Sequence, residues 1–141
     1  MGRQRQESRV DGDPAAGADG AERTCASCGR RMAPRARWSR SPDEVRWCSD
    51  ACRRRKVTAT DLALEEAVLA LLAARPARAT ICPSEAARQV VGDDETAWRP
   101  LMEPARRAAR RLVARGVVEI TQRGSVVDPS TARGPVRVRL R

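Results

Sequence analysis

Two short stretches decide the fold of the N-terminal third, Cys25-Ala26-Ser27-Cys28 and Cys48-Ser49-Asp50-Ala51-Cys52. Each stretch brings two thiols close together along the chain, and nineteen residues separate the two pairs. Two cysteines on a tight turn can hold one edge of a tetrahedral metal ion, and a second pair completes the tetrahedron. Because the chain contains no histidine, four thiolates must be the ligands. The sequence therefore predicts one structural zinc ion per chain, bound by Cys25, Cys28, Cys48 and Cys52.

The residues around the cysteines suit such a site. Gly29 follows the first pair and can take a positive φ in a tight turn. Ser49 or Asp50 can cap a helix that starts between the ligands of the second pair, so that Cys52 projects from its first turn. Two disulfides, unrelated thiols and an iron site with the same ligands are the alternatives that the spacing leaves open.

The charge of the chain predicts a polyanionic partner. The 141 residues carry a formal net charge of +10, which favours nucleic acid or an anionic surface over a neutral partner. Residues 25–56 hold ten basic and three acidic residues, a net charge of +7, and form the predicted zinc-binding module. An alternative is that the charge only keeps a small protein in solution.

The N-terminal segment carries few apolar residues, and no apolar run in the chain is long. Residues 1–24 include a single bulky apolar residue, Val10, and predict a disordered tail that is not a signal peptide. The longest uncharged apolar run, residues 67–74, is too short to span a membrane. We therefore expect a cytoplasmic protein with no membrane partner, in which close cysteine pairs bind metal rather than form disulfides.

Residues 57–141 predict a second domain with a definite order of elements. The periodicity indicates a helix over 61–74 capped by Thr58 or Asp61, an extended piece over 80–82, and a helix from Pro83 to 91. A third helix follows near 97–115, with an irregularity at Pro100 or Pro104. Strands are expected at 117–121, 125–127 and 136–140. This order is that of a winged helix-turn-helix, so the predicted fold class is α+β, a small four-cysteine zinc finger followed by a winged-helix domain.

One face of the third helix is covered by arginines. The opposite face is apolar, which is the division that a recognition helix needs to dock on its domain and meet phosphates or base edges. The predicted nucleic-acid contacts are Arg106, Arg107, Arg110, Arg111 and Arg115 of this helix, Arg123 at a turn, and Arg30, Arg31, Arg53 and Arg54 of the zinc module. The alternative is a solvated face on an ordinary amphipathic helix.

Two stretches resemble known families. The first stretch, over about residues 24–55, resembles treble-clef zinc fingers and, more narrowly, a small uncharacterised bacterial zinc-finger family. The residues that carry this resemblance are Cys25-Ala26-Ser27-Cys28-Gly29-Arg30, Trp38 and Asp43-Glu44-Val45-Arg46-Trp47-Cys48-Ser49. The second stretch, over about residues 62–140, resembles a bacterial winged-helix-like domain family of unknown function. The residues that carry this resemblance are Thr80-Ile81-Cys82-Pro83-Ser84-Glu85, Trp98-Arg99-Pro100-Leu101 and Glu119-Ile120-Thr121-Gln122. The resemblances imply a metal site and a fold, but no activity.

Three functions are compatible with these patterns. The first is a non-enzymatic nucleic-acid-binding protein, with DNA expected in preference to RNA, built from two basic modules on a short linker. The second is a zinc-stabilised adaptor that holds another protein. The third is an enzyme or redox sensor that uses Cys82, which precedes Pro83 at a helix start where a thiol pKa can fall. The absence of histidine excludes Cys–His and Ser–His–Asp catalysis.

Overall fold

A computed structural model describes the chain over residues 23–32 and 46–141. The predicted tail falls outside this range except for its last two residues, which form strand β1 (Arg23–Thr24). Strand β1 pairs antiparallel with β2 (Arg31–Met32). The loop between them, residues 25–30, carries the first cysteine pair and is called the knuckle below.

Helix α1 (Asp50–Arg55) starts between Cys48 and Cys52, as the sequence predicts. Ser49 is its N-cap, because the backbone amide of Cys52 donates to the Ser49 hydroxyl at 3.1 Å. The helix ends at Lys56, which has a positive φ of 56°. The capping serine thus fixes the first turn that carries Cys52.

Helix α2 (Ala59–Ala73) begins with a reciprocal cap. The backbone amide of Asp61 donates to the Thr58 hydroxyl, and the Thr58 amide donates to the Asp61 carboxylate. Strand β3 (Thr80–Ile81) and helix α3 (Pro83–Val91) follow, and α3 has Pro83 in its first turn, where a missing amide hydrogen costs nothing.

The third predicted helix is interrupted at Pro100, whereas Pro104 lies in the first turn of the helix that follows. Helix α4 (Glu95–Trp98) passes into a 3₁₀ turn (Arg99–Leu101) and then into helix α5 (Met102–Ala114). Strands β4 (Val118–Gln122), β5 (Ser125–Val126) and β6 (Arg137–Leu140) complete the chain. The predicted order of elements is confirmed, with boundaries that differ by a few residues.

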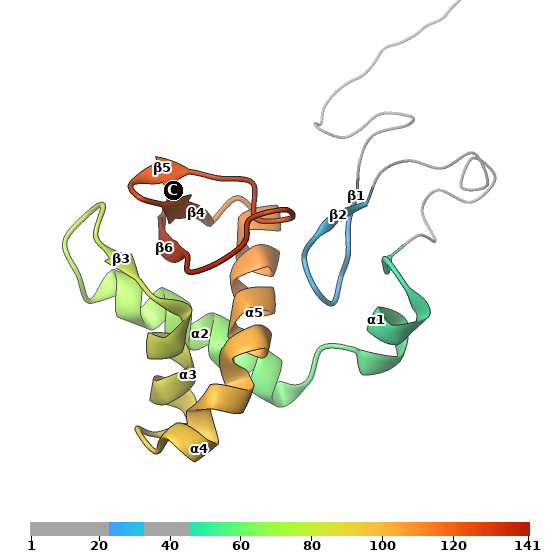
Figure 1. Ribbon diagram of the computed structural model, residues 1–141, viewed down its shortest axis with the longest axis horizontal. Coiled ribbons are helices and arrows are strands. Elements are labelled where there is room, and N and C mark those ends of the chain that lie inside the picture. Colours follow the sequence, from blue (N-terminus) through green and yellow to red (C-terminus); the bar gives the residue numbers. More distant parts are fainter. Residues whose placement is uncertain (1–22, 33–45) are drawn as a thin grey trace, which may run out of the picture.

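The last strands and β3 form a four-stranded sheet in the order β3-β6-β4-β5 (Figure 1). All its strand pairs are antiparallel. The main core lies between this sheet and helices α2, α3 and α5, and its buried residues are Ala67, Val68, Leu72, Ile81, Ala86, Ala109, Leu112, Val118, Ile120, Val136 and Val138. The fold is therefore a mixed helix and sheet arrangement with the four cysteines near its N-terminus.

Alanines let the helices approach one another closely. Ala87 of α3 and Ala105 and Ala108 of α5 are fully buried together with Leu64 of α2. Trp98 packs against this cluster, and the guanidinium groups of Arg88 and Arg99 lie 5.6 and 5.3 Å from the centre of its ring. Trp98 thus covers one side of this helical cluster.

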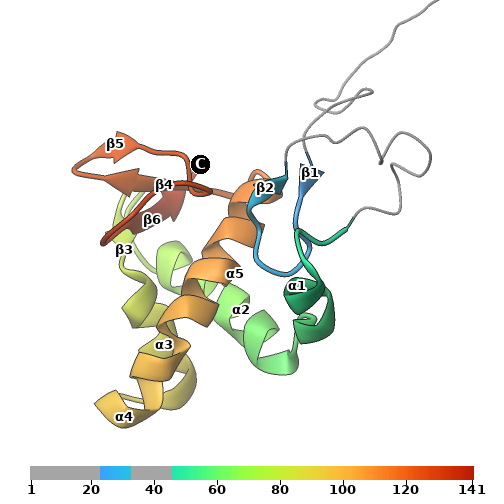
Figure 2. The same ribbon diagram turned by 45° about the vertical axis from the view of Figure 1, so that its right-hand side comes forward.

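The knuckle lies beside α5, on the side away from the sheet, and α1 lies on the outer side of the knuckle (Figure 2). Among the helices of residues 46–141, none combines the length and the apolar character needed to cross a bilayer.

Candidate metal centre

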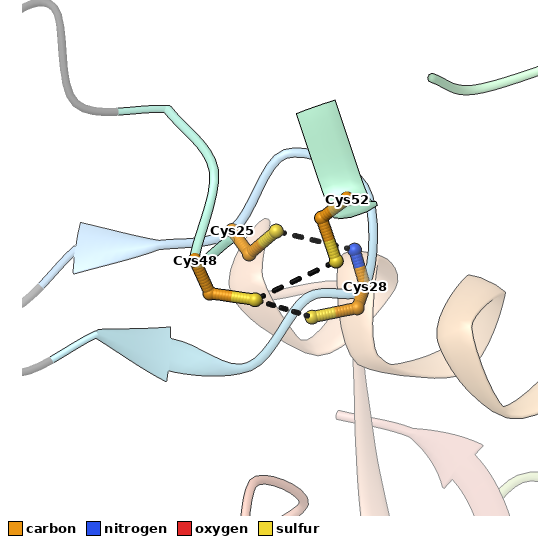
Figure 3. A group of neighbouring side chains, drawn as sticks. All are labelled: Cys25, Cys28, Cys48 and Cys52. Carbon is orange, nitrogen blue, oxygen red and sulfur yellow. Dashed lines mark hydrogen bonds between the residues drawn. The ribbon is translucent and has the colours of Figure 1, made fainter. Parts of the chain in front are cut away.

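The side chains of the four predicted ligands point toward one another (Figure 3). The sulfur atoms of Cys25, Cys28, Cys48 and Cys52 all lie within 4.8 Å of one another. The Cys28 and Cys48 sulfurs are 3.7 Å apart, and those of Cys48 and Cys52 are 3.5 Å apart. Sulfurs bound tetrahedrally at about 2.3 Å from Zn²⁺ lie about 3.8 Å from one another, so the cluster has the size that zinc requires. All five cysteines are free thiols in the structure, which is the form that metal binding requires.

Local hydrogen bonds shape the knuckle before any metal is considered. The Gly29 amide donates to the Cys25 carbonyl at 2.9 Å, and the Cys25 amide donates to the Arg30 carbonyl at 2.8 Å. Gly29 has a φ of 79°, which is the positive φ that the sequence predicts there. The Ala26 amide donates to the Arg46 carbonyl at 2.7 Å and joins the knuckle to the segment that carries Cys48. The backbone therefore presents the two cysteine pairs to each other.

The acidities of the thiols show that they are crowded. Burial is the largest influence on the pKa of Cys25 and raises it, but hydrogen bonds from the backbone amides of Cys28, Cys48 and Ser27 bring the pKa below its usual 9.0, to about 7. Burial and the neighbouring thiols raise the pKa of Cys48 to about 12. Thiolates this close repel one another, and a bound divalent cation would offset the repulsion.

The donor set therefore fits a metal ion such as zinc. Four sulfur ligands fill a tetrahedron and leave no open position for a substrate, which is the arrangement of structural rather than catalytic zinc. Arg55 adds an outer contact, because its Nη1 donates to the Cys52 sulfur at 3.4 Å. Trp47 packs against the cysteines together with buried Met32.

The structure places the predicted arginine contacts in different surroundings. Arg30, Arg53 and Arg54 are exposed on the knuckle and on α1. Arg31 is also exposed and forms an ion pair with Asp128 at 2.6 Å. Arg123 is exposed at the turn between β4 and β5, with a φ of 53°.

The arginines of α5 do not form one exposed face. Arg106 donates to the carbonyl of Gly134 at 2.9 Å, and Arg115 pairs with Glu65 at 2.6 Å. Burial lowers the pKa of the half-buried Arg107, and the nearby positive charge of Arg55 lowers it further. Arg107 thus remains partly accessible, whereas the other two are already engaged.

The expected exposure of Arg110 and Arg111 is wrong. Each is only 5% exposed. Arg110 donates through Nε to the Cys28 carbonyl at 2.6 Å and through Nη2 to Glu103 at 2.9 Å. Arg111 donates through Nε to Glu65 at 2.5 Å and through Nη1 to the Ser27 carbonyl at 2.7 Å. The side that the sequence assigns to solvent is covered by the knuckle, so these guanidinium groups are structural.

Because of this contact, the zinc-binding module packs against the C-terminal domain and is not joined to it by the short linker alone. Sequence reasoning missed the docking of the knuckle on α5, and the residue that could have indicated it is Gly29. A methyl group added at Gly29 would lie 2.5 Å from the Arg110 Cβ and 2.6 Å from the Arg111 backbone nitrogen. Glycine is therefore required there both by its φ and by the close approach of two backbones.

Two separate stretches of the chain match known families. Residues 18–55 match a family described as "Uncharacterized protein conserved in bacteria (DUF2256)". Residues 61–141, which make up more than half of the chain, match a family described as "Protein of unknown function (DUF3253)". A comparison with curated proteins returned no match. The chain therefore belongs to the DUF3253 family of proteins of unknown function, and carries at its N-terminus a stretch similar to the DUF2256 family.

Proposed function

We propose that this protein is a non-enzymatic nucleic-acid-binding protein in which a structural zinc ion holds the cationic helix α1 in place. The observation that carries the proposal is a run of four consecutive cations, Arg53, Arg54, Arg55 and Lys56, all exposed. The run begins one residue after Cys52, so the metal centre would fix where these charges lie.

The surroundings of these cations favour a polyanionic partner. Within residues 23–32 and 46–141, no carboxylate pairs with Arg53, Arg54 or Lys56. Cations without a carboxylate partner raise the local positive potential and can neutralise phosphates with release of counterions. Arg107 of α5 adds a positive charge close enough to Arg55 for the two to repel.

For the C-terminal domain we propose a fold of the winged-helix type. In support, three helices, α2, α3 and α5, precede the β4–β5 hairpin, and β3 lies beside the returning strand β6. In this fold the third helix ordinarily enters the major groove. Because Arg110 and Arg111 are buried under the knuckle, the proposed contact surface moves from α5 to α1 and Arg107. DNA remains the expected partner in preference to RNA.

The non-enzymatic, cytoplasmic part of the proposal rests on chemistry. A chain without histidine lacks the usual general base, and a closed four-thiolate site would give zinc no open position. Free thiols suit the reducing cytoplasm.

An adaptor that binds another protein is the second candidate. The observation in its favour is the exposure of two apolar side chains, Val57 between α1 and α2 at 37% and Leu62 near the start of α2 at 52%. Binding carried by these residues would depend little on salt, whereas binding to phosphates depends on it steeply.

The test is a fluorescence anisotropy titration of the zinc-loaded full chain with labelled random-sequence duplex DNA, and with RNA of the same length, at several salt concentrations. The affinity should fall with salt at a log–log slope of about −0.9 per phosphate contact on duplex DNA. The double variant Arg53→Ala/Arg54→Ala should reduce the slope by about 1.8. The matched control, Arg133→Ala/Arg141→Ala, removes the same charge from exposed positions at the other end of the chain. Equal slopes for both double variants, or no binding by the wild type, would contradict the proposal.

A further inference from the structure

The knuckle is bound to α5 by both side chains and backbone. Arg110 and Arg111 reach the carbonyls of Cys28 and Ser27, which are residues of the metal-binding turn itself. Gly29 lies directly against the α5 backbone. The amide of Arg31, the first residue after the knuckle, donates to the Ser130 hydroxyl at 2.8 Å and adds a third attachment, to the loop between β5 and β6.

The same two arginines also belong to the interior of the C-terminal domain. Arg111 lies one residue before Leu112, which is fully buried in the main core. Its Nη2 donates to the Asp61 carbonyl of α2 at 3.3 Å, in addition to its ion pair with Glu65. A buried guanidinium group without partners is costly, because its charge has left water. The knuckle carbonyls are therefore part of what makes burial of these side chains tolerable.

The turn that supplies those carbonyls depends on the cysteines. Cys28 offers its sulfur to the metal site and its carbonyl to Arg110, so one residue serves both contacts. A bound metal would hold the turn in the shape that Arg110 and Arg111 require.

We infer that metal occupancy is transmitted to the C-terminal domain through Arg110 and Arg111, so that the metal site and helices α2 and α5 form one cooperative unit. Both arginines then act as positioning residues for the metal site, and the metal in turn stabilises a domain that holds none of its ligands. The inference rests on the metal site of the proposed function but needs no nucleic acid, so failure of DNA binding alone would leave it standing.

Hydrogen exchange measured by mass spectrometry on the full chain tests the inference. Zinc-loaded protein is compared with protein stripped by a chelator under reducing conditions. Loss of zinc should accelerate exchange in α2 and α5 as well as in residues 23–56. Acceleration confined to residues 23–56, with unchanged protection of α2 and α5, would overturn the inference.

A matched pair of variants tests the role of the arginines. Arg110→Met keeps the aliphatic stem but removes the donor to Cys28, and Arg106→Met makes the same change one turn earlier, where the partner is Gly134. Affinity for Co²⁺, followed by its thiolate absorption, should fall about 10- to 100-fold in Arg110→Met, as for other residues that orient metal ligands, and should stay at the wild-type value in Arg106→Met.

Ser130→Ala provides a second variant if Arg110→Met does not fold. Ser130 lies outside the core and is not a ligand of the metal site, yet its hydroxyl accepts a hydrogen bond from the amide of Arg31, directly after the knuckle. A smaller loss of Co²⁺ affinity in the same direction is expected. Wild-type Co²⁺ affinity in Ser130→Ala, together with α5 protection that does not respond to zinc, would overturn the inference.

Discussion

The Nε atom of Arg110 lies 2.6 Å from the backbone carbonyl oxygen of Cys28, a residue 82 positions away along the chain. This hydrogen bond joins a helix of the C-terminal domain to a residue whose sulfur belongs to the metal site. Beside it, Arg111 makes the same kind of bond to Ser27. Arg110 and Arg111 thus join α5 to the knuckle, and the proposed contacts with an outside partner are the exposed cations of α1 and the partly accessible Arg107.

The buried ion pair between Arg111 and Glu65 provides a prediction about stability. Arg111→Leu leaves Glu65 buried with Arg115 as its remaining ion-pair partner, and should lower the free energy of unfolding by about 3 kcal/mol, since breaking a buried pair strands a charge. The double variant Arg111→Leu/Glu65→Leu should be less destabilised than the single variant, because no carboxylate is stranded. Urea denaturation measures both. Equal destabilisation of the two variants would show that the pair is not the cause.

Arg107 and Arg111 should now behave differently, although they lie on the same helix. Arg107→Ala should lower the salt dependence of DNA binding by about 0.9 in log–log slope, if its half-buried guanidinium meets a phosphate. Arg111→Gln should leave the slope unchanged but reduce stability. The anisotropy titrations above, repeated with both variants, check this. A reduced slope for Arg111→Gln, with an unchanged slope for Arg107→Ala, would instead support the prediction from the sequence that Arg111 contacts a phosphate.

Much of the fold could be predicted from the sequence, because its signals are local. Cysteine spacing, the capping residues Ser49 and Thr58, and Pro83 at a helix start each act within a few residues. The β4–β5 turn at Arg123 and Gly124 is of the same kind.

The docking of the knuckle on α5 could not be predicted in this way. Helical periodicity divides the faces of α5 into apolar and charged, and it assigns every guanidinium group to solvent. Arg110 and Arg111 are buried because carbonyls more than 80 residues away satisfy their donors, and nothing in the local sequence encodes that pairing. Gly29 carried the single local signal, and it indicates a close approach without naming the partner.

Cys82 should be dispensable for binding and for metal. It is the N-cap of α3, its side chain is half-buried, and its sulfur accepts a hydrogen bond from the Ser84 hydroxyl at 3.1 Å. Cys82→Ser keeps an acceptor at this position, so the free energy of unfolding should change by about 1 kcal/mol or less. Zinc content and DNA affinity should equal those of the wild type. An activity abolished by this substitution alone would instead support the enzyme or redox-sensor hypothesis.

Glu85 should make stability depend on pH in the acidic range. The hydrogen bond from Arg75 at 2.5 Å, only partly offset by burial, holds the Glu85 pKa below its usual 4.5. A lowered folded-state pKa contributes stability above pH 4.5, and this contribution is lost as the pH falls through the lower folded-state value. Glu85→Gln should therefore flatten the dependence of the unfolding midpoint on pH below 4.5. Identical pH profiles for the two proteins would exclude this role.

The metal content of the purified chain tests the central claim most directly. Elemental analysis of a soluble, reduced preparation should find one zinc per chain, and Cys48→Ser or Cys52→Ser should lose it, since structural zinc contributes roughly 10–16 kcal/mol of apparent binding free energy. The matched substitution Cys82→Ser, in the cysteine outside the cluster, should retain the full content. Folded wild-type protein with no bound metal, or equal metal content in all these variants, would contradict the account.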